Sequence, residues 1–112
     1  MDGSLPNISP KDLNSLIGTA ACPIIIDVRK RPAFDAAKIM IATAAWRDYQ
    51  RAVEWAADLP QDKDVVVYCV HGHEVSQGAA AVLQSKGLRV RYLAGGIEAF
   101  EEAGGKLMSR AG

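Results

Sequence analysis

Hydrophobic and polar positions follow two different periods along this chain. Short apolar runs rich in β-branched residues predict buried strands at 23–28 and 65–68, and alternation predicts another at 88–93. A further short extended segment is expected within 39–44. Apolar residues spaced three and four apart predict helices at 10–17, 32–38, 48–59, 75–86 and 97–103. Strands that alternate with helices imply right-handed crossovers and a parallel sheet with helices on both faces.

Residues typical of helix ends support this division. Ser9 followed by Pro10 is typical of a helix N-terminus, and Gly87 of a helix C-terminus. Gly78 instead lies inside the predicted helix 75–86, where glycine costs about 1 kcal/mol relative to alanine. We therefore expect this helix to approach the sheet closely at Gly78.

Length and composition restrict the class of protein. The 112 residues are expected to form a single domain, 1–112, with its core at about 9–105. Apolar residues make up 49% of the chain and charged residues 23%, as in globular proteins. Thirteen basic residues offset thirteen acidic ones, which argues against nucleic acid or an anionic membrane as partner. The first residues lack the pattern of an export signal, so we expect a cytoplasmic location.

Cys69 is the strongest candidate for chemistry. It directly follows the predicted strand 65–68, and sites in parallel sheets form at the carboxyl ends of strands. The backbone N–H groups of a short loop can surround the sulfur, and the next helix N-terminus adds positive potential. Both effects favour the thiolate, which is the nucleophilic form. Gly72 allows the positive φ that such a loop commonly needs, whereas Cys22 lacks this setting and is interpreted as structural.

Three segments together carry a family resemblance. They are Ile-Asp-Val-Arg at 26–29 followed by Phe34, Val-Tyr-Cys at 67–69 with a six-residue loop, and Leu-Ala-Gly-Gly-Ile at 93–97. In this order and spacing the chain resembles the rhodanese-like sulfurtransferases, in particular the single-domain ones. The resemblance implies a three-layer α/β/α domain with a parallel sheet of about five strands.

The same resemblance implies a reaction. Cys69 would attack the sulfane sulfur of a donor such as thiosulfate and release sulfite. The resulting persulfide would then pass its sulfur to a thiol, to cyanide or to a protein acceptor. Such double displacement splits one transfer into two easier steps, and no metal or organic cofactor is implied.

Other residues receive roles by their place near Cys69. The loop residues expected to form the substrate cradle are Val70, His71, Gly72, His73 and Glu74. Glu74 departs from the family, and its carboxylate would oppose a thiolate if it faced the sulfur. Residues 37–42 also lack the family's G-H-I-x-G-A stretch. Asp27 and Arg29 are expected to brace neighbouring loops, and Trp46 to border the pocket.

Three alternatives follow from the same residues. A cysteine phosphatase needs an arginine six positions after the cysteine to grip phosphate, and Val75 stands there. Alternation of Cys69, His71 and His73 could indicate zinc or copper, but alternate side chains of a tight loop diverge, so we expect no metal. A non-catalytic binding module with the same fold is the third alternative, and retention of Cys69 argues against it.

Overall fold

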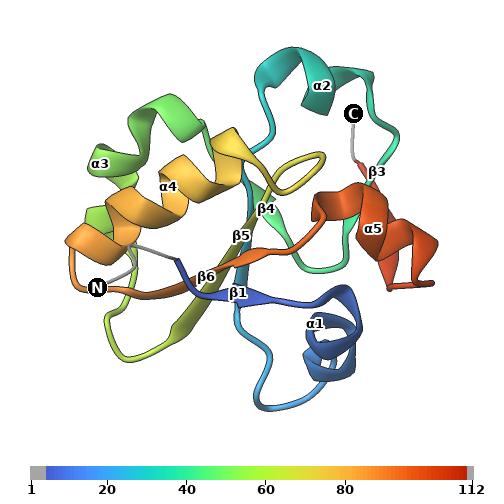
Figure 1. Ribbon diagram of the computed structural model, residues 1–112, viewed down its shortest axis with the longest axis horizontal. Coiled ribbons are helices and arrows are strands. Elements are labelled where there is room, and N and C mark those ends of the chain that lie inside the picture. The colour runs from blue at the N-terminus through green and yellow to red at the C-terminus, as the bar shows by residue number, and fades with distance from the viewer. Residues whose placement is uncertain (1–4, 111–112) are drawn as a thin grey trace.

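The computed structural model describes residues 5–110, and Figure 1 shows the arrangement of the elements. In chain order they are β1 (Asn7–Ile8), α1 (Pro10–Leu16), β2 (Ile24–Asp27), α2 (Arg31–Ala36), β3 (Ile39–Ile41), β4 (Ala45–Trp46), η1 (Tyr49–Arg51), α3 (Ala52–Trp55), η2 (Ala56–Asp58), β5 (Asp64–Tyr68), α4 (Glu74–Ser85), β6 (Arg89–Leu93), α5 (Gly96–Glu102) and β7 (Leu107–Ser109).

Five strands form one parallel sheet in the order β1-β6-β5-β2-β4. The central strand β5 pairs with β2 so that Asp27 lies opposite Tyr68, at the carboxyl end of both strands. Cys69 therefore leaves the sheet at the edge where Asp27 ends its own strand. The predicted parallel α/β sheet of about five strands is confirmed.

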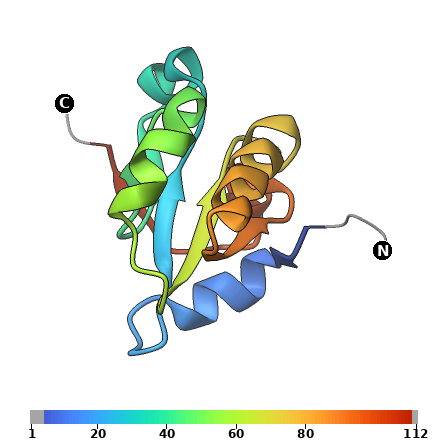
Figure 2. The same cartoon turned by 90° about the vertical axis from the view of Figure 1, so that its left-hand side faces the viewer.

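Helices cover both faces of this sheet, as Figures 1 and 2 show. The buried residues form two clusters, one beneath α3 and α4 and the other beneath α1 and α5. On β5, Val65 and Val67 belong to the first cluster, and Val66 and Tyr68 to the second. Because this strand is buried on both faces, its sequence is a continuous apolar run without alternation.

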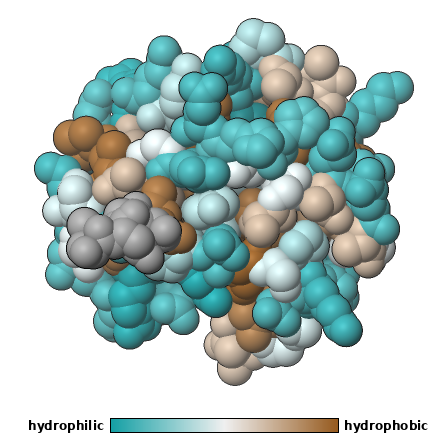
Figure 3. Space-filling model, viewed as in Figure 1, coloured by the Kyte–Doolittle hydropathy of each residue, from teal (hydrophilic) through white to brown (hydrophobic). Residues whose placement is uncertain are grey.

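The outer surface has a different character from these clusters. On the face seen in Figure 3, hydrophilic side chains cover most of the surface and hydrophobic ones lie in small separate patches. Across residues 5–110, no helix has the length and apolar character required to cross a membrane.

The structure differs from the expected elements in several places. Segment 39–44 contributes β3, which pairs antiparallel with β7 in a separate two-stranded sheet. Neither β7 nor the two-residue β1 was predicted, because such short strands depend on a distant partner rather than on local pattern. The expectation for Gly78 was wrong: it is exposed, and no described atom lies within 4 Å of a β-carbon built there.

Candidate active site

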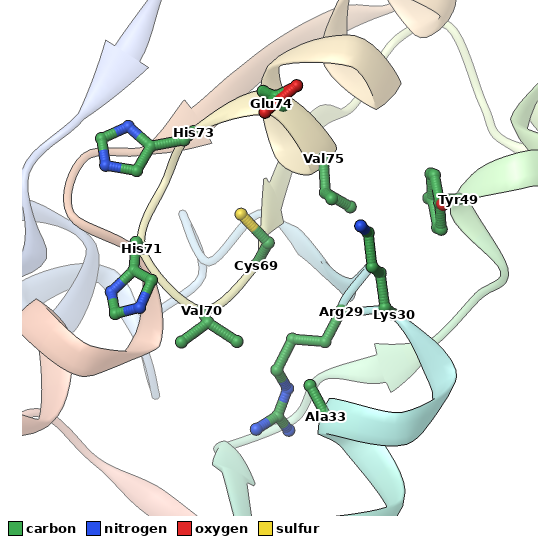
Figure 4. A pocket seen from close by; sticks show the side chains of 10 residues that line it. All are labelled: Arg29, Lys30, Ala33, Tyr49, Cys69, Val70, His71, His73, Glu74 and Val75. Carbon is green, nitrogen blue, oxygen red and sulfur yellow. The ribbon is translucent and has the colours of Figure 1, made fainter.

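Cys69 lies at the base of a cavity of about 360 Å³ at the carboxyl edge of the sheet. The residue is only 6% exposed, so the cavity is its route to solvent. The lining comes from the loop after β5, the start of α4, and the segments around α2 and η1 (Figure 4). The lining residues are Arg29, Lys30, Ala33, Tyr49, Cys69, Val70, His71, His73, Glu74 and Val75.

The loop after Cys69 is held from behind by α5. The Ile97 N–H donates to the Cys69 carbonyl at 2.9 Å, and the Glu98 N–H donates to the Val70 carbonyl at 3.1 Å. Because C=O and N–H of a trans peptide point in opposite directions, the N–H groups of Val70 and His71 point away from α5. The Gln77 side chain also donates to the Gly72 carbonyl at 2.9 Å. Helix α5 and Gln77 thus fix the carbonyl side of this loop.

The backbone N–H groups of this loop have no hydrogen-bond acceptor among the described residues. The backbone N–H groups from Val70 to His73 donate to no described residue, and the first turn of α4 adds the unpaired N–H groups of any helix start. Gly72 has φ +77°, and the β-carbon of another residue there would lie 2.7 Å from the Gly95 nitrogen. The loop can therefore offer several N–H donors to one anion, as an anion-binding nest does.

Ser76 is a residue of the site that sequence reasoning missed. Its hydroxyl oxygen lies 3.2 Å from the Cys69 sulfur, and the residue is fully buried on the first turn of α4. The thiol donates to this oxygen, and once the sulfur is a thiolate the hydroxyl can rotate and donate to it. The contact depends on the path of the loop between the two residues, which local sequence patterns do not specify. The one signal in the sequence is that Ser76 is a polar residue within the predicted helix 75–86.

Asp27 and Arg29 form a buried ion pair beneath the cavity. The Arg29 Nη2 to Asp27 Oδ2 distance is 2.6 Å, and their side chains are 3% and 0% exposed. The same Arg29 nitrogen donates to the Ile39 carbonyl at 3.1 Å, and the Tyr68 hydroxyl donates to Asp27 at 2.9 Å. The pair thereby links the ends of β2 and β5 to β3, and Asp27 offsets the charge that Arg29 brings to the cavity.

Burial also changes the chemistry of Tyr68. Loss of solvent raises the pKa of this phenol well above its usual value, and the nearby Asp27 carboxylate raises it further. Its hydroxyl both donates to Asp27 and accepts from the Ile41 N–H at 3.1 Å. Tyr68 is therefore a neutral linking group directly before Cys69.

The remaining predicted residues lie at the rim of the cavity. His71 Nδ1 lies 3.2 Å from a Glu98 carboxylate oxygen, and both side chains are more than half exposed. The His71 and His73 rings have their centroids 6.3 Å apart. Glu74 is exposed and is the first residue of α4 rather than the last residue of the loop. A carboxylate at that position is favourable for the helix.

Trp46 does not border the cavity. Its ring stacks on Phe34 at 5.4 Å between centroids, and its indole N–H donates to the Arg29 carbonyl at 2.9 Å. Lys30 and Tyr49 line the cavity, and Trp46 is not among its lining residues. Within the described part of the chain, no three His, Cys, Asp or Glu side chains are grouped so that they could hold a metal ion.

A buried cysteine that faces uncommitted amides at the carboxyl edge of a parallel sheet defines a class of sites that bind anions beside a sulfur nucleophile. Comparison of the sequence with known protein families identifies the family within that class. Residues 9–103 match the rhodanese-like domain, and the chain belongs to this family, which is part of the sulfurtransferase superfamily. Among curated proteins, none matches the sequence.

Solved structures of similar proteins share the fold over almost the full chain. A full-length protein from Lactobacillus plantarum is 24% identical, with a TM-score of 0.83 over 93% of this chain and 88% of its own. A rhodanese-related protein from Thermoplasma volcanium is 27% identical, with a TM-score of 0.78 over 92% and 97%. A protein from Rhodopseudomonas palustris, described as of unknown function and a possible tyrosine phosphatase, is 25% identical, with a TM-score of 0.80 over 96% and 87%.

Proposed function

We propose that this protein is a sulfurtransferase that carries sulfur as a persulfide on Cys69. In the first half-reaction the Cys69 thiolate attacks the sulfane sulfur of thiosulfate. A sulfur–sulfur bond forms at Cys69, the bond between the two donor sulfurs breaks, and sulfite leaves with the electron pair. In the second half-reaction a thiol or cyanide takes the outer sulfur and restores the thiolate.

The observation that carries this proposal is the environment of the Cys69 sulfur. Ser76 lies 3.2 Å away as a hydroxyl donor for the thiolate, and the N–H groups of the loop are uncommitted. Hydrogen bonds to an anion are stronger than those between neutral groups, so both the thiolate and an anionic donor gain from this arrangement. Asp27 and Arg29 serve the site by bracing, since their charges are satisfied by each other.

A phosphatase is the less favoured function for this chain. The neighbour from Rhodopseudomonas palustris is described as a possible tyrosine phosphatase. In the present chain Val75, six positions after Cys69, lines the cavity. Valine offers no bidentate donor for a phosphate, so the charge of a phosphoryl group would lack the guanidinium that phosphatase chemistry requires.

Mass spectrometry of the intact protein tests the proposal. After incubation with thiosulfate and removal of the excess, the protein is expected to gain the mass of one sulfur atom and to lose it again on addition of cyanide. Cys69→Ser should abolish the gain, and Cys22→Ser, a half-buried cysteine outside the cavity, should retain it. No gain from thiosulfate or from inorganic polysulfide in the wild-type protein would refute persulfide chemistry and favour a non-catalytic binding module.

A further inference from the structure

Apart from His73, the cavity above Cys69 carries one charged side chain of each sign that has no partner among the described residues. We propose that it is matched to small zwitterionic thiols of the amino-acid class, with Lys30 binding their carboxylate and Glu74 their ammonium group. The inference rests on the proposed sulfur transfer and identifies the substrate class of the half-reaction with an organic thiol.

Two of the other titratable side chains of the lining have partners. Arg29 is paired with Asp27 at 2.6 Å, and His71 is paired with Glu98 at 3.2 Å. Lys30 and Glu74, by contrast, form no ion pair and no side-chain hydrogen bond with any of residues 5–110, and both are exposed. His73 also lines the cavity without an ion pair to any of residues 5–110. A ligand in the cavity therefore meets Lys30 as an available ammonium group and Glu74 as an available carboxylate.

These two charges come from different elements on the cavity wall. In Figure 4 the Lys30 ammonium lies beside Val75, on the opposite side of Cys69 from the two histidines, and Glu74 lies at the start of α4. A dianion such as thiosulfate is attracted by Lys30 and repelled by Glu74, whereas a zwitterion can interact favourably with both. The lining charges thus discriminate by the arrangement of charge on the ligand.

The rest of the lining suits a small organic body. Ala33, Val70 and Val75 supply apolar contacts, and Tyr49 adds an aromatic ring. The volume of about 360 Å³ is at the small end of ligand cavities, which run from about 300 to 1,000 Å³. A three-carbon amino-acid thiol offers an apolar methylene beside its two charges, which inorganic thiosulfate lacks.

The transfer step needs no further reactant. The acceptor thiolate attacks the outer sulfur of the Cys69 persulfide and forms a new sulfur–sulfur bond. The bond between the outer sulfur and Cys69 Sγ breaks, and Sγ keeps the electron pair as a thiolate. The proton of the persulfide stays on the transferred sulfur, so the products are the acceptor persulfide and the free Cys69 thiolate.

Three acceptor thiols of similar size distinguish the contribution of Lys30 from that of Glu74. The protein is loaded with sulfur from inorganic polysulfide, freed of excess, and discharged with cysteine, cysteamine or 3-mercaptopropionate, and the loss of one sulfur mass is followed with time. The variants are Lys30→Met and Glu74→Gln. Lys63→Met and Glu101→Gln are the controls, because both residues are exposed and neither lines the cavity. Each rate is expressed relative to wild type with the same acceptor, which cancels the different reactivities of the thiols.

We expect Lys30→Met to slow discharge of the persulfide by cysteine and by 3-mercaptopropionate about two- to fivefold, which is the effect of one exposed charge pair. The rate of discharge by cysteamine, which has no carboxylate, should not change. Glu74→Gln should slow discharge by cysteine and by cysteamine by a similar factor, and it should increase the rate of discharge by 3-mercaptopropionate. Equal effects on all three acceptors, or effects no larger than those of the controls, would overturn the inference while leaving sulfur transfer intact. Failure of polysulfide to load Cys69 in the wild-type protein would instead refute the proposed function.

Discussion

Gly96, the first residue of α5, is the position where a single added methyl group should affect the Cys69 loop most directly. Its φ is +65°, and a β-carbon there would lie 2.5 Å from the Cys69 carbonyl oxygen and nearer still to that of Val70. Both carbonyls accept hydrogen bonds from the next two residues of α5, so neither can move away without breaking one. Gly96→Ala must therefore displace either the loop or the helix.

Gly104 provides a matched control. Its φ of +77° imposes the same left-handed backbone, but no described atom lies within 4 Å of an added β-carbon. The backbone conformation alone costs about 1–2 kcal/mol for a residue with a side chain. The clash at Gly96 adds roughly 1–3 kcal/mol, the usual cost of overpacking. We therefore expect Gly104→Ala to lose about 1–2 kcal/mol and Gly96→Ala about 2–5 kcal/mol.

Urea unfolding followed by tryptophan fluorescence measures both losses, since Trp55 is buried. The rate of Cys69 alkylation by iodoacetamide, on a Cys22→Ser background, reports the loop separately. Gly96→Ala should change this rate, and Gly104→Ala should not. If Gly96→Ala proves no less stable than Gly104→Ala and alkylates at the wild-type rate, the close packing of α5 against the Cys69 loop is wrong.

Three further predictions concern α4 and Tyr68. Gly78→Ala should raise the free energy of unfolding by about 1 kcal/mol in urea, because Gly78 is exposed within α4 with open space beside it; a loss would contradict that geometry. Ser76→Ala should slow Cys69 alkylation by about tenfold through loss of a hydrogen bond to the thiolate, and Ser85→Ala, an exposed serine of the same helix, should not. Burial raises the pKa of Tyr68, so above pH ~10 the unfolded chain loses this proton first and the free energy of unfolding falls as pH rises, by about 1.4 kcal/mol per unit. Tyr68→Phe should remove this contribution to the slope, and an unchanged slope would refute it.

The sequence by itself determined the three central strands of the sheet, β2, β5 and β6, and the place of the candidate nucleophile. The apolar run 65–68 is continuous because β5 is buried on both faces, and that pattern is local enough to be recognised without a structure. Since chemistry in a parallel sheet gathers at the carboxyl ends of strands, Cys69 and Asp27 could be placed at the same edge from their positions alone.

Only the tertiary structure decided which groups surround Cys69. The Ser76 hydroxyl at 3.2 Å, and the α5 amides that hold the Cys69 and Val70 carbonyls, reach the loop from separate elements. Trp46, expected at the pocket, packs on Phe34 instead. Hydrophobic periodicity reports which face of an element is buried, but contacts between side chains distant in sequence depend on the paths of the loops that join them. Those contacts determine which hydrogen-bond donors the Cys69 sulfur and its ligands meet.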